Sequence, residues 1–254
     1  MDRTFAVTPL PYGAVHFLIL LGIAAILVVC ALAIRKADER RLLRLLCVFG
    51  VCMLVAEVWK QWFVMRFVYR DTPSMWFFPW QLCSMAMYCS AIVPFLKGRM
   101  QDAVLVFLCT FSVIGAVFAL LFPEDMMRPQ ILLFVHSFLY HAVMLIEGLL
   151  ALRILKGRRK APFWPALVLY LCMAAVAELI NIVSHWIIRD IHYESNMFYI
   201  TPFYPSTQPV FRLIAQHAGI PVEILVYLGV IALAAYLLYL LESLLHRKEP
   251  SRQA

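Results

Sequence analysis

Three residues of this chain place a thiol and imidazoles within long apolar stretches. Cys83 lies in one such stretch, and His136 and His141 lie in a later one. A neutral thiol attacks carbonyl carbon poorly, but a nearby imidazole can remove its proton and make it nucleophilic. The two histidines are about 140° apart on a helix, so we expect only one of them to face a shared cavity well. Cys83 with one histidine would suit acyl transfer; the alternative is an inert packing cysteine.

Further polar side chains occur in the same apolar stretches. Each ionisable group inside hydrocarbon costs roughly 2.5 kcal/mol or more on the insertion scale, which makes it a functional candidate. These polar residues are Glu57, Lys60, Gln61, Gln81, Ser84, Glu178 and Asn181.

The composition indicates what kind of chain positions these side chains. Of its 254 residues, 64% are apolar and only 15% are charged, and the mean hydropathy is +0.84. A soluble domain carries about a quarter charged residues. A soluble globule, a disordered chain, a collagen-like repeat and a disulfide-rich secreted module are therefore excluded. The remaining class is an all-α polytopic membrane protein.

Hydrophobic segments of about 20 residues are long enough to cross the bilayer as helices. The sequence predicts seven of them in one transmembrane domain covering 1–254, and none alternates in polarity as a barrel strand does. Their bounds are about 14–34, 45–66, 76–96, 102–122, 131–153, 163–188 and 221–245.

Lys and Arg alternate between two sets of loops, which predicts the orientation in the cell membrane. The rich set holds Arg35, Lys36, Arg40, Arg41, Arg44, Lys97, Arg99, Arg153, Lys156, Arg158, Arg159, Lys160, Arg247, Lys248 and Arg252. The poor set holds Arg3, Arg66, Arg70, Arg128, Arg189 and Arg212. This pattern places the N-terminus outside and the C-terminus in the cytoplasm. The basic residues thus indicate topology, and no nucleic-acid partner is predicted.

The predicted spans bring the polar residues to a common depth. Glu57, Cys83, His141 and Asn181 all fall roughly 7–15 Å below the outer ends of their helices. We therefore expect a polar cavity in the outer half of the bilayer, with membrane lipids as environment and substrate. The alternative is that these polar side chains only bond to one another. Glu57 would then pair with Lys60 on one helix face, and amide side chains would join neighbouring helices.

Other motifs add little chemistry. All seven cysteines fall within predicted spans, which argues against a disulfide framework and suggests buried thiols. No metal-ligand spacing and no phosphate loop occurs, so neither a metal nor a cofactor is predicted. The longest loop, about 189–220, is rich in aromatic residues and prolines, including Tyr193, and is expected to form an ordered lid at the membrane interface.

The run Phe78-Pro79-Trp80-Gln81-Leu82-Cys83-Ser84 leads into the third predicted span. It resembles the LPLHLCS signature of the YwaF-like bacterial integral membrane proteins, with Gln81 where that family has His. Similar features elsewhere are Phe5, Thr8-Pro9, His16, Glu57, Gln61, Ser137, His141, Asn181, Asn196-Met197-Phe198, Pro202 and Gly219-Ile220-Pro221. After that last proline, Val222-Glu223 replaces the family's aromatic run.

That family is related to an animal transmembrane acyltransferase that moves fatty acyl groups onto ether lysophospholipids. The resemblance implies a lipid acyltransferase or acyl hydrolase with Cys83 as nucleophile and His141 as base. Orienting or substrate-binding roles, including hydrogen bonds to the oxyanion, are expected for Gln81, Ser84, Glu57, Gln61, His136, Glu178, Asn181 and Asn196.

Two other classes share this topology. A transporter or binding protein for a small polar or lipidic ligand would use Glu57, Lys60, His141 and Glu178 as coordinating or proton-coupled groups. A seven-helix receptor is the third class, but the last predicted span has no lysine for a retinal Schiff base.

Overall fold

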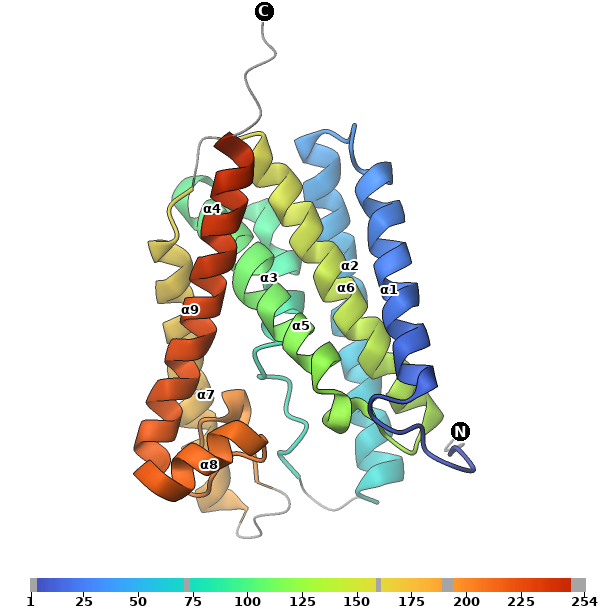
Figure 1. Cartoon of the computed structure of the whole chain (residues 1–254), viewed down its shortest axis with the longest axis vertical. Helices are drawn as coiled ribbons and strands as arrows, with labels where there is room; N and C mark the ends of the chain where they lie inside the picture. The colour runs from blue at the N-terminus through green and yellow to red at the C-terminus, as the bar shows by residue number, and fades with distance from the viewer. Residues whose placement is uncertain (1–3, 71–73, 159–160, 189–193, 248–254) are drawn as a thin grey trace, which may run out of the picture.

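The computed structural model describes residues 4–70, 74–158, 161–188 and 194–247, which form a helical bundle (Figure 1). Within these ranges the only β-type pairing is an isolated bridge between Thr4 and Gln130. Six helices are long and apolar enough to cross a membrane: Ala14–Ala33, Glu39–Val68, Gly98–Leu121, Ile131–Lys156, Trp164–Ile187 and Ile220–Leu244. The chain is therefore an all-helical, multi-pass membrane protein.

The long rods differ in their regularity. Four are plain α-helices: α1 (Ala14–Ala33), α6 (Ile131–Lys156), α7 (Trp164–Ile187) and α9 (Ile220–Arg247). The second rod is α2 (Glu39–Phe63) extended by a π-helical turn, Val64–Val68. Another joins α4 (Gly98–Phe107) to α5 (Val113–Leu121) through the π-helical turn Leu108–Ser112.

The shorter elements connect these rods. They are α3 (Met85–Ile92), α8 (Pro209–Ala218) and the 3₁₀ turns Val93–Phe95, Pro123–Met126 and Met197–Tyr199.

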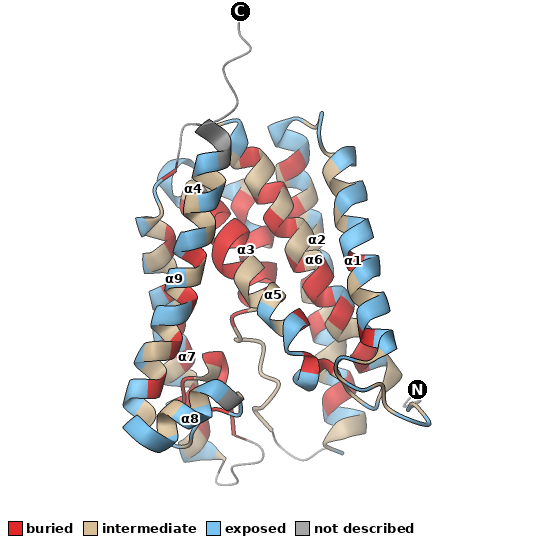
Figure 2. Ribbon diagram, in the orientation of Figure 1, coloured by how far each residue is buried: buried red, intermediate tan, exposed pale blue. Residues whose placement is uncertain are grey.

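The core lies along α3, α6 and α4 with its π-helical turn Leu108–Ser112, while the outward faces of α1 and α9 are exposed (Figure 2). On those faces Leu18, Leu21, Leu225 and Leu233 are all more than half exposed. Such an apolar surface is stable only in contact with lipid.

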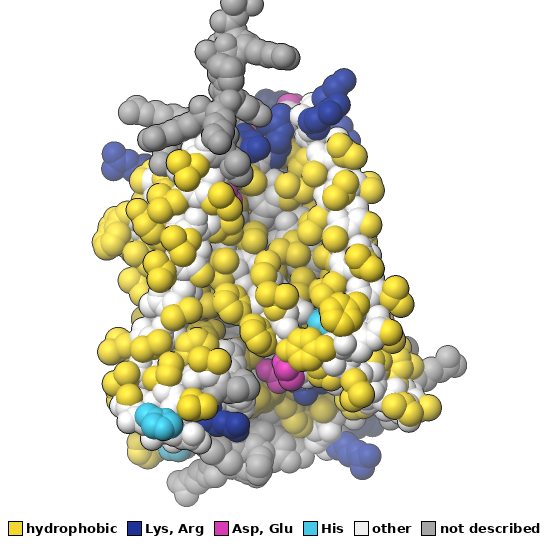
Figure 3. Space-filling view, viewed as in Figure 1, with side chains coloured by type: hydrophobic (Ala, Val, Ile, Leu, Met, Phe, Trp, Pro, Cys, Tyr) yellow, Lys and Arg dark blue, Asp and Glu magenta, His cyan; other side chains and the backbone are white. Residues whose placement is uncertain are grey.

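Figure 3 shows hydrophobic side chains over the middle of the molecule and Lys and Arg gathered at one end, where α1 ends. The opposite end, where α1 begins, holds fewer cations on the face shown. The predicted orientation is based on such an uneven distribution of Lys and Arg between the two ends of the bundle. Six of the basic residues counted in the sequence lie outside the described residues, namely Arg3, Arg159, Lys160, Arg189, Lys248 and Arg252.

The prediction of a continuous third helix over 76–96 is wrong. The described chain from 74 to 84 is irregular, and α3 begins only at Met85. Pro79 accounts for the difference, because its ring removes an amide donor and disfavours helical backbone at the preceding residue. Most residues from 74 to 84 are half-buried, and their conformation depends on proline.

Hydrogen bonds to two rods, α2 and α7, hold this irregular segment in place. Gln61 donates from Nε2 to the carbonyl oxygen of Phe77, and the Trp80 indole donates to the carbonyl oxygen of Met173 at 3.2 Å. Irregular backbone at membrane depth persists only where it is buried in protein or lines a cavity. The segment preceding α3 is therefore where a site is expected.

Gly50 permits the close packing of α2 against α3, which positions Glu57 beside this segment. A Cβ at Gly50 would lie 2.4 Å from the backbone nitrogen of Ala91 and 2.8 Å from the carbonyl oxygen of Met87. Helix association in membranes relies on such small residues.

Gly50→Ala is therefore expected to lower the free energy of unfolding by about 1–3 kcal/mol, because α3 must move. Thermal unfolding in detergent measures this effect. Gly22→Ala in α1 is the matched control, since no atom lies within 4 Å of its added Cβ. Equal melting temperatures for the two variants would contradict the close-packing argument.

Part of the loop predicted over about 189–220 folds into the bundle, and α8 lies within the same stretch. Asn196, Met197, Phe198 and Thr201 are each at most 2% exposed. Phe198 adopts φ 57°, a left-handed conformation unusual for a bulky residue, so surrounding contacts must impose it. Residues 189–193 of the predicted loop, including Tyr193, lie outside the described residues.

Candidate functional site

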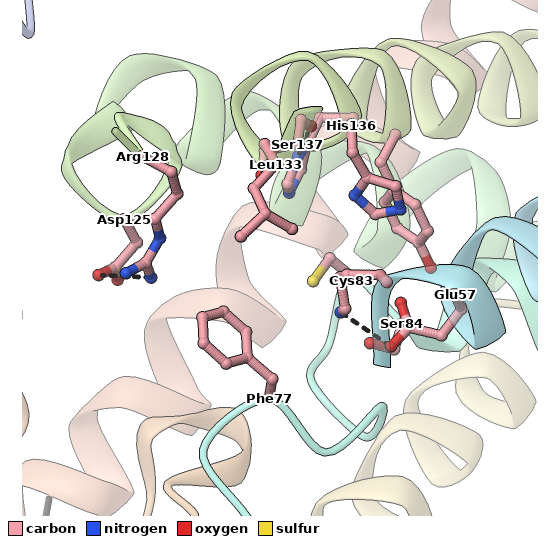
Figure 4. Close-up of a pocket in the computed structure, with 12 residues that line it drawn as sticks. Glu57, Phe77, Cys83, Ser84, Asp125, Arg128, Leu133, His136 and Ser137 are labelled. Carbon is pink, nitrogen blue, oxygen red and sulfur yellow. Dashed lines mark hydrogen bonds and ion pairs between the residues drawn. The ribbon is translucent and has the colours of Figure 1, made fainter. Parts of the chain in front are cut away.

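A pocket of about 90 Å³ lies between α2, α6, the irregular segment before α3 and the turn that follows α5 (Figure 4). Six of the polar residues selected from the sequence line it: Glu57, Lys60, Cys83, Ser84, His136 and His141. Phe77, Asp125, Arg128, Leu133, Ser137 and Tyr140 complete the wall. The structure thus gathers thiol, imidazole and charged groups in one cavity.

Cys83 lies two residues before the first residue of α3. Figure 4 shows its sulfur directed toward the space between Leu133 and Phe77. The position suits a nucleophile that attacks a group entering the pocket.

His141 is oriented by its own helix. Its Nδ1 lies 2.7 Å from the carbonyl oxygen of Ser137. A carbonyl oxygen only accepts hydrogen bonds, so Nδ1 carries the proton and Nε2 holds the lone pair. This is the tautomer that a general base requires.

His136 also lines the pocket, so the expectation that only one histidine would face it is wrong. Its ring lies 5.9 Å from that of Trp59 and 5.6 Å from that of Tyr140, between centroids. Its buried Nε2 has no hydrogen-bond partner among the described residues. The pocket follows α6 for more than one turn, which is why both histidines reach it.

Tyr140 was not selected from the sequence. Its hydroxyl is buried beside the pocket and has no hydrogen-bond partner among the described residues. A buried hydroxyl normally finds a partner, so an unpaired one at a cavity wall is available to donate to a ligand. Within an apolar run a tyrosine is read as core, and no sequence signal distinguished it.

The pocket wall carries a buried ion pair. The Glu57 carboxylate accepts from Lys60 Nζ at 2.8 Å and from Gln61 Nε2 at 2.6 Å. Glu57 is only 4% exposed. Lys60 Nζ also lies 5.9 Å from the ring centroid of Phe77. Gln61 does not line the pocket; it supports Glu57 and Phe77, which do.

A second pair of opposite charges lies at the other side of Phe77. Arg128 stands 5.1 Å from the Phe77 ring centroid and 4.0 Å from Asp125. The hydroxyl of Tyr199, in the loop between α7 and α8, donates to the Asp125 carboxylate at 3.0 Å. Burial, together with the neighbouring Asp125 carboxylate, raises the pKa of Tyr199, so the phenol remains a donor. Neither Asp125 nor Arg128 was selected from the sequence.

Besides Gln61, four predicted site residues lie outside the pocket. Glu178 is on α7, away from the lining, and one of its carboxyl oxygens is buried without a partner among the described residues. Gln81 donates to the carbonyl oxygen of Asn196 and accepts from the amide of Phe198, both at 2.8 Å. Asn196 accepts from the amide of Thr201 at 3.2 Å.

Asn181 makes a similar two-point contact with the loop. Its Oδ1 accepts from the Met197 amide at 2.6 Å, and its Nδ2 donates to the Met197 carbonyl oxygen at 3.1 Å. The expected oxyanion donors Gln81 and Asn181 therefore hold the loop instead. Neither of them lines the pocket.

Asn181→Ala is expected to destabilise the protein by about 2–4 kcal/mol, because it leaves buried backbone groups of the loop unpaired. Thermal unfolding in detergent is the measurement, and Cys172→Ala on the exposed side of α7 is the matched control. A melting temperature equal to that of the control would show that Asn181 does not hold the loop.

The cysteines and possible metal ligands add no second site. Among the described residues no group of three or more His, Cys, Asp or Glu side chains could hold a metal ion. All seven cysteines are free. Cys52 and Cys172 are exposed on the helix surface, so the interpretation of all seven as buried thiols is wrong for these two.

Comparisons with known proteins place the chain in a family. Searches of the curated proteins and of the solved structures gave no match. A sequence model of the TMEM164 family matches residues 11–240, which include every residue that lines the pocket. This chain therefore belongs to the TMEM164 family, a family of transmembrane proteins.

Proposed function

We propose that this protein is a membrane-embedded phospholipid acyltransferase or acyl hydrolase in which Cys83 is the nucleophile and His141 is the base. The observation that carries the proposal is their presence in one pocket, with His141 held in the tautomer that accepts a proton at Nε2. The resemblance of the Cys83 motif to an acyltransferase-related family supports the same chemistry.

In the first half-reaction, His141 Nε2 takes the thiol proton and the Cys83 sulfur attacks the ester carbonyl carbon of a phospholipid. The carbonyl π electrons move to oxygen, and Tyr140 and Ser84, which line the pocket, would donate to this oxyanion. The ester carbon–oxygen bond then breaks. The departing lysophospholipid oxygen takes the proton from His141, which leaves an acyl thioester on Cys83.

In the second half-reaction, the hydroxyl group of a lysophospholipid attacks the thioester carbonyl, and His141 takes its proton. The carbon–sulfur bond breaks, the acyl chain is now on the acceptor, and the proton returns from His141 to sulfur. Water in place of the lysophospholipid gives a free fatty acid. The two activities differ only in the acceptor.

The size and charge of the pocket suit a lipid ester. A volume of about 90 Å³ holds an ester group and its neighbouring atoms, so the acyl chains would remain in the bilayer. Lys60 and Arg128, both stacked against Phe77, would bind the phosphate. Asp125, at the rim and 57% exposed, would bind the amine of a zwitterionic headgroup.

In this proposal the chain crosses the membrane seven times, with its N-terminus outside and the pocket in the outer half of the bilayer. The third crossing consists of the irregular segment 74–84 followed by α3 and its final turn. The distribution of Lys and Arg between the two ends supports this orientation.

Purified protein in vesicles tests the function. The vesicles contain a diacyl phospholipid with an isotopically heavy acyl chain and an unlabelled lysophospholipid. We expect heavy acyl chains to appear on the acceptor or as free fatty acid, as measured by lipid mass spectrometry. Product formation no greater than in protein-free vesicles would reject both activities.

The two ion pairs in the pocket also support a second candidate, a binding or transport protein for a zwitterionic lipid or small ligand. This candidate predicts that ligand binding or flux survives Cys83→Ala but is lost in Glu57→Gln. The acyltransferase proposal instead predicts that Cys83→Ala stops lipid turnover and leaves lipid binding intact.

A further inference from the structure

A second cavity lies at the opposite end of the bundle from the Cys83 pocket. It has a volume of about 360 Å³ and is a groove between the C-terminal ends of α1 and α6. Ala31 of α1 lines its wall, together with Ile34 and Arg35 directly after that helix. Its location at the basic end places it where lipid headgroups meet hydrocarbon.

The spacing of the lining residues gives the groove an ordered polarity. α6 contributes Leu149, Leu152, Arg153 and Lys156, at positions i, i+3, i+4 and i+7, which share one helix face. The leucines lie deeper in the bundle, and the two cations lie in the last turn of the helix. At the end of α1, Ala31 and Ile34 likewise precede Arg35.

The cations of the groove are not neutralised by neighbouring carboxylates. Arg153 donates to the carbonyl oxygen of Arg35 at 2.9 Å, which fixes its guanidinium but leaves its charge unpaired. Among the described residues, Arg35, Arg153 and Lys156 form no ion pair, although Glu242 acts on Lys156 at longer range.

Arg158 shows the contrasting case at the same end of the molecule. It is paired with both Glu39 and Asp102, the latter at 2.7 Å, and serves to join helices. Unlike Arg158, the groove cations are available to an anionic ligand.

We infer that this groove binds one anionic phospholipid, with its phosphodiester on Arg35, Arg153 and Lys156 and an acyl chain against Leu149 and Leu152. Basic pockets between transmembrane helices are suited to phosphate headgroups. The wall contains no carboxylate to bind the amine of a zwitterionic lipid. A free phosphate would satisfy the cations but would leave the apolar wall unused.

Native mass spectrometry of the full chain, purified with equal amounts of phosphatidylglycerol and phosphatidylcholine, tests this inference. We expect the protein to retain phosphatidylglycerol preferentially. In the variant Arg35→Gln/Arg153→Gln/Lys156→Gln, the amount of retained phosphatidylglycerol is expected to fall at least about tenfold. Equal retention of the two lipids by the wild-type protein would overturn the inference.

Arg40→Gln/Arg41→Gln/Arg44→Gln is the matched control, since it removes the same charge from α2 outside the groove. We expect it to retain phosphatidylglycerol as the wild-type protein does. The inference fails if this control loses as much lipid as the groove variant, because the effect would then be general charge attraction.

Leu152→Trp tests the apolar wall with all charges intact, and it is expected to reduce lipid retention as well. Inorganic phosphate is the competing probe. If inorganic phosphate displaces phosphatidylglycerol and Leu152→Trp retains it normally, the site binds phosphate alone and the lipid assignment is wrong.

Discussion

Cys83→Ala is expected to reduce acyl transfer by at least about 10³-fold, because no other thiol lines the pocket to form the acyl intermediate. Cys83→Ser should be nearly as inactive, since an alcohol at this position keeps the shape but is a far weaker nucleophile. The measurement is transfer of a labelled acyl chain in vesicles at equal protein concentration.

Cys52→Ala and Cys172→Ala are the matched controls, since both thiols are exposed on the outside of the helices. Both should retain full activity. Thermal unfolding of each variant establishes that the protein is folded. If folded Cys83→Ala turned over lipid at the wild-type rate, the thiol mechanism would be excluded.

His141→Gln is expected to lower the rate of acyl transfer by about 10²–10⁴-fold, because the thiol then has no base. The defect should lessen as pH rises. Below its pKa, an unassisted thiol ionises about ten times more for each unit by which the pH rises. The pH–rate profile of the variant against the wild-type protein measures this recovery.

His136→Gln is the comparison that distinguishes the two histidines of the pocket. It preserves the tautomer of His141 set by Ser137 and is expected to lower the rate by much less. A larger loss in His136→Gln than in His141→Gln, or a His141→Gln rate independent of pH, would reverse the assignment of the base.

The bounds of the long helices were predicted closely where the length and hydrophobicity of a segment determine its structure. The predicted spans 14–34, 131–153 and 163–188 correspond to Ala14–Ala33, Ile131–Lys156 and Trp164–Ile187. The span 76–96 was wrong because its conformation depends on Pro79 and on side-chain hydrogen bonds from Gln61 in another helix. Such long-range contacts leave no hydrophobicity signal.

Depth along a helix was predictable, but direction around it was not. The rise per residue brought Glu57, Cys83 and His141 to one level, and these three share the pocket. The same argument placed Gln81 and Asn181 at that level, yet both form hydrogen bonds with the loop between α7 and α8. Their direction is set by how the loop folds, which a count of residues along one helix does not include.

The rim of the pocket could not be predicted from the spans. Asp125 and Arg128 belong to a connection between two helices, and they reach the pocket because a 3₁₀ turn carries that connection back toward Phe77. The orientation of His141 by the Ser137 carbonyl was likewise not predicted, although the four-residue spacing made the contact geometrically available.

Rapid quenching of the protein with a heavy-acyl phospholipid and no acceptor tests the central claim most directly. Intact-protein and peptide mass spectrometry should find one heavy acyl group on Cys83, released by neutral hydroxylamine and absent from Cys83→Ala. Turnover without any acyl group on Cys83, or with the acyl group on another residue, would contradict the account.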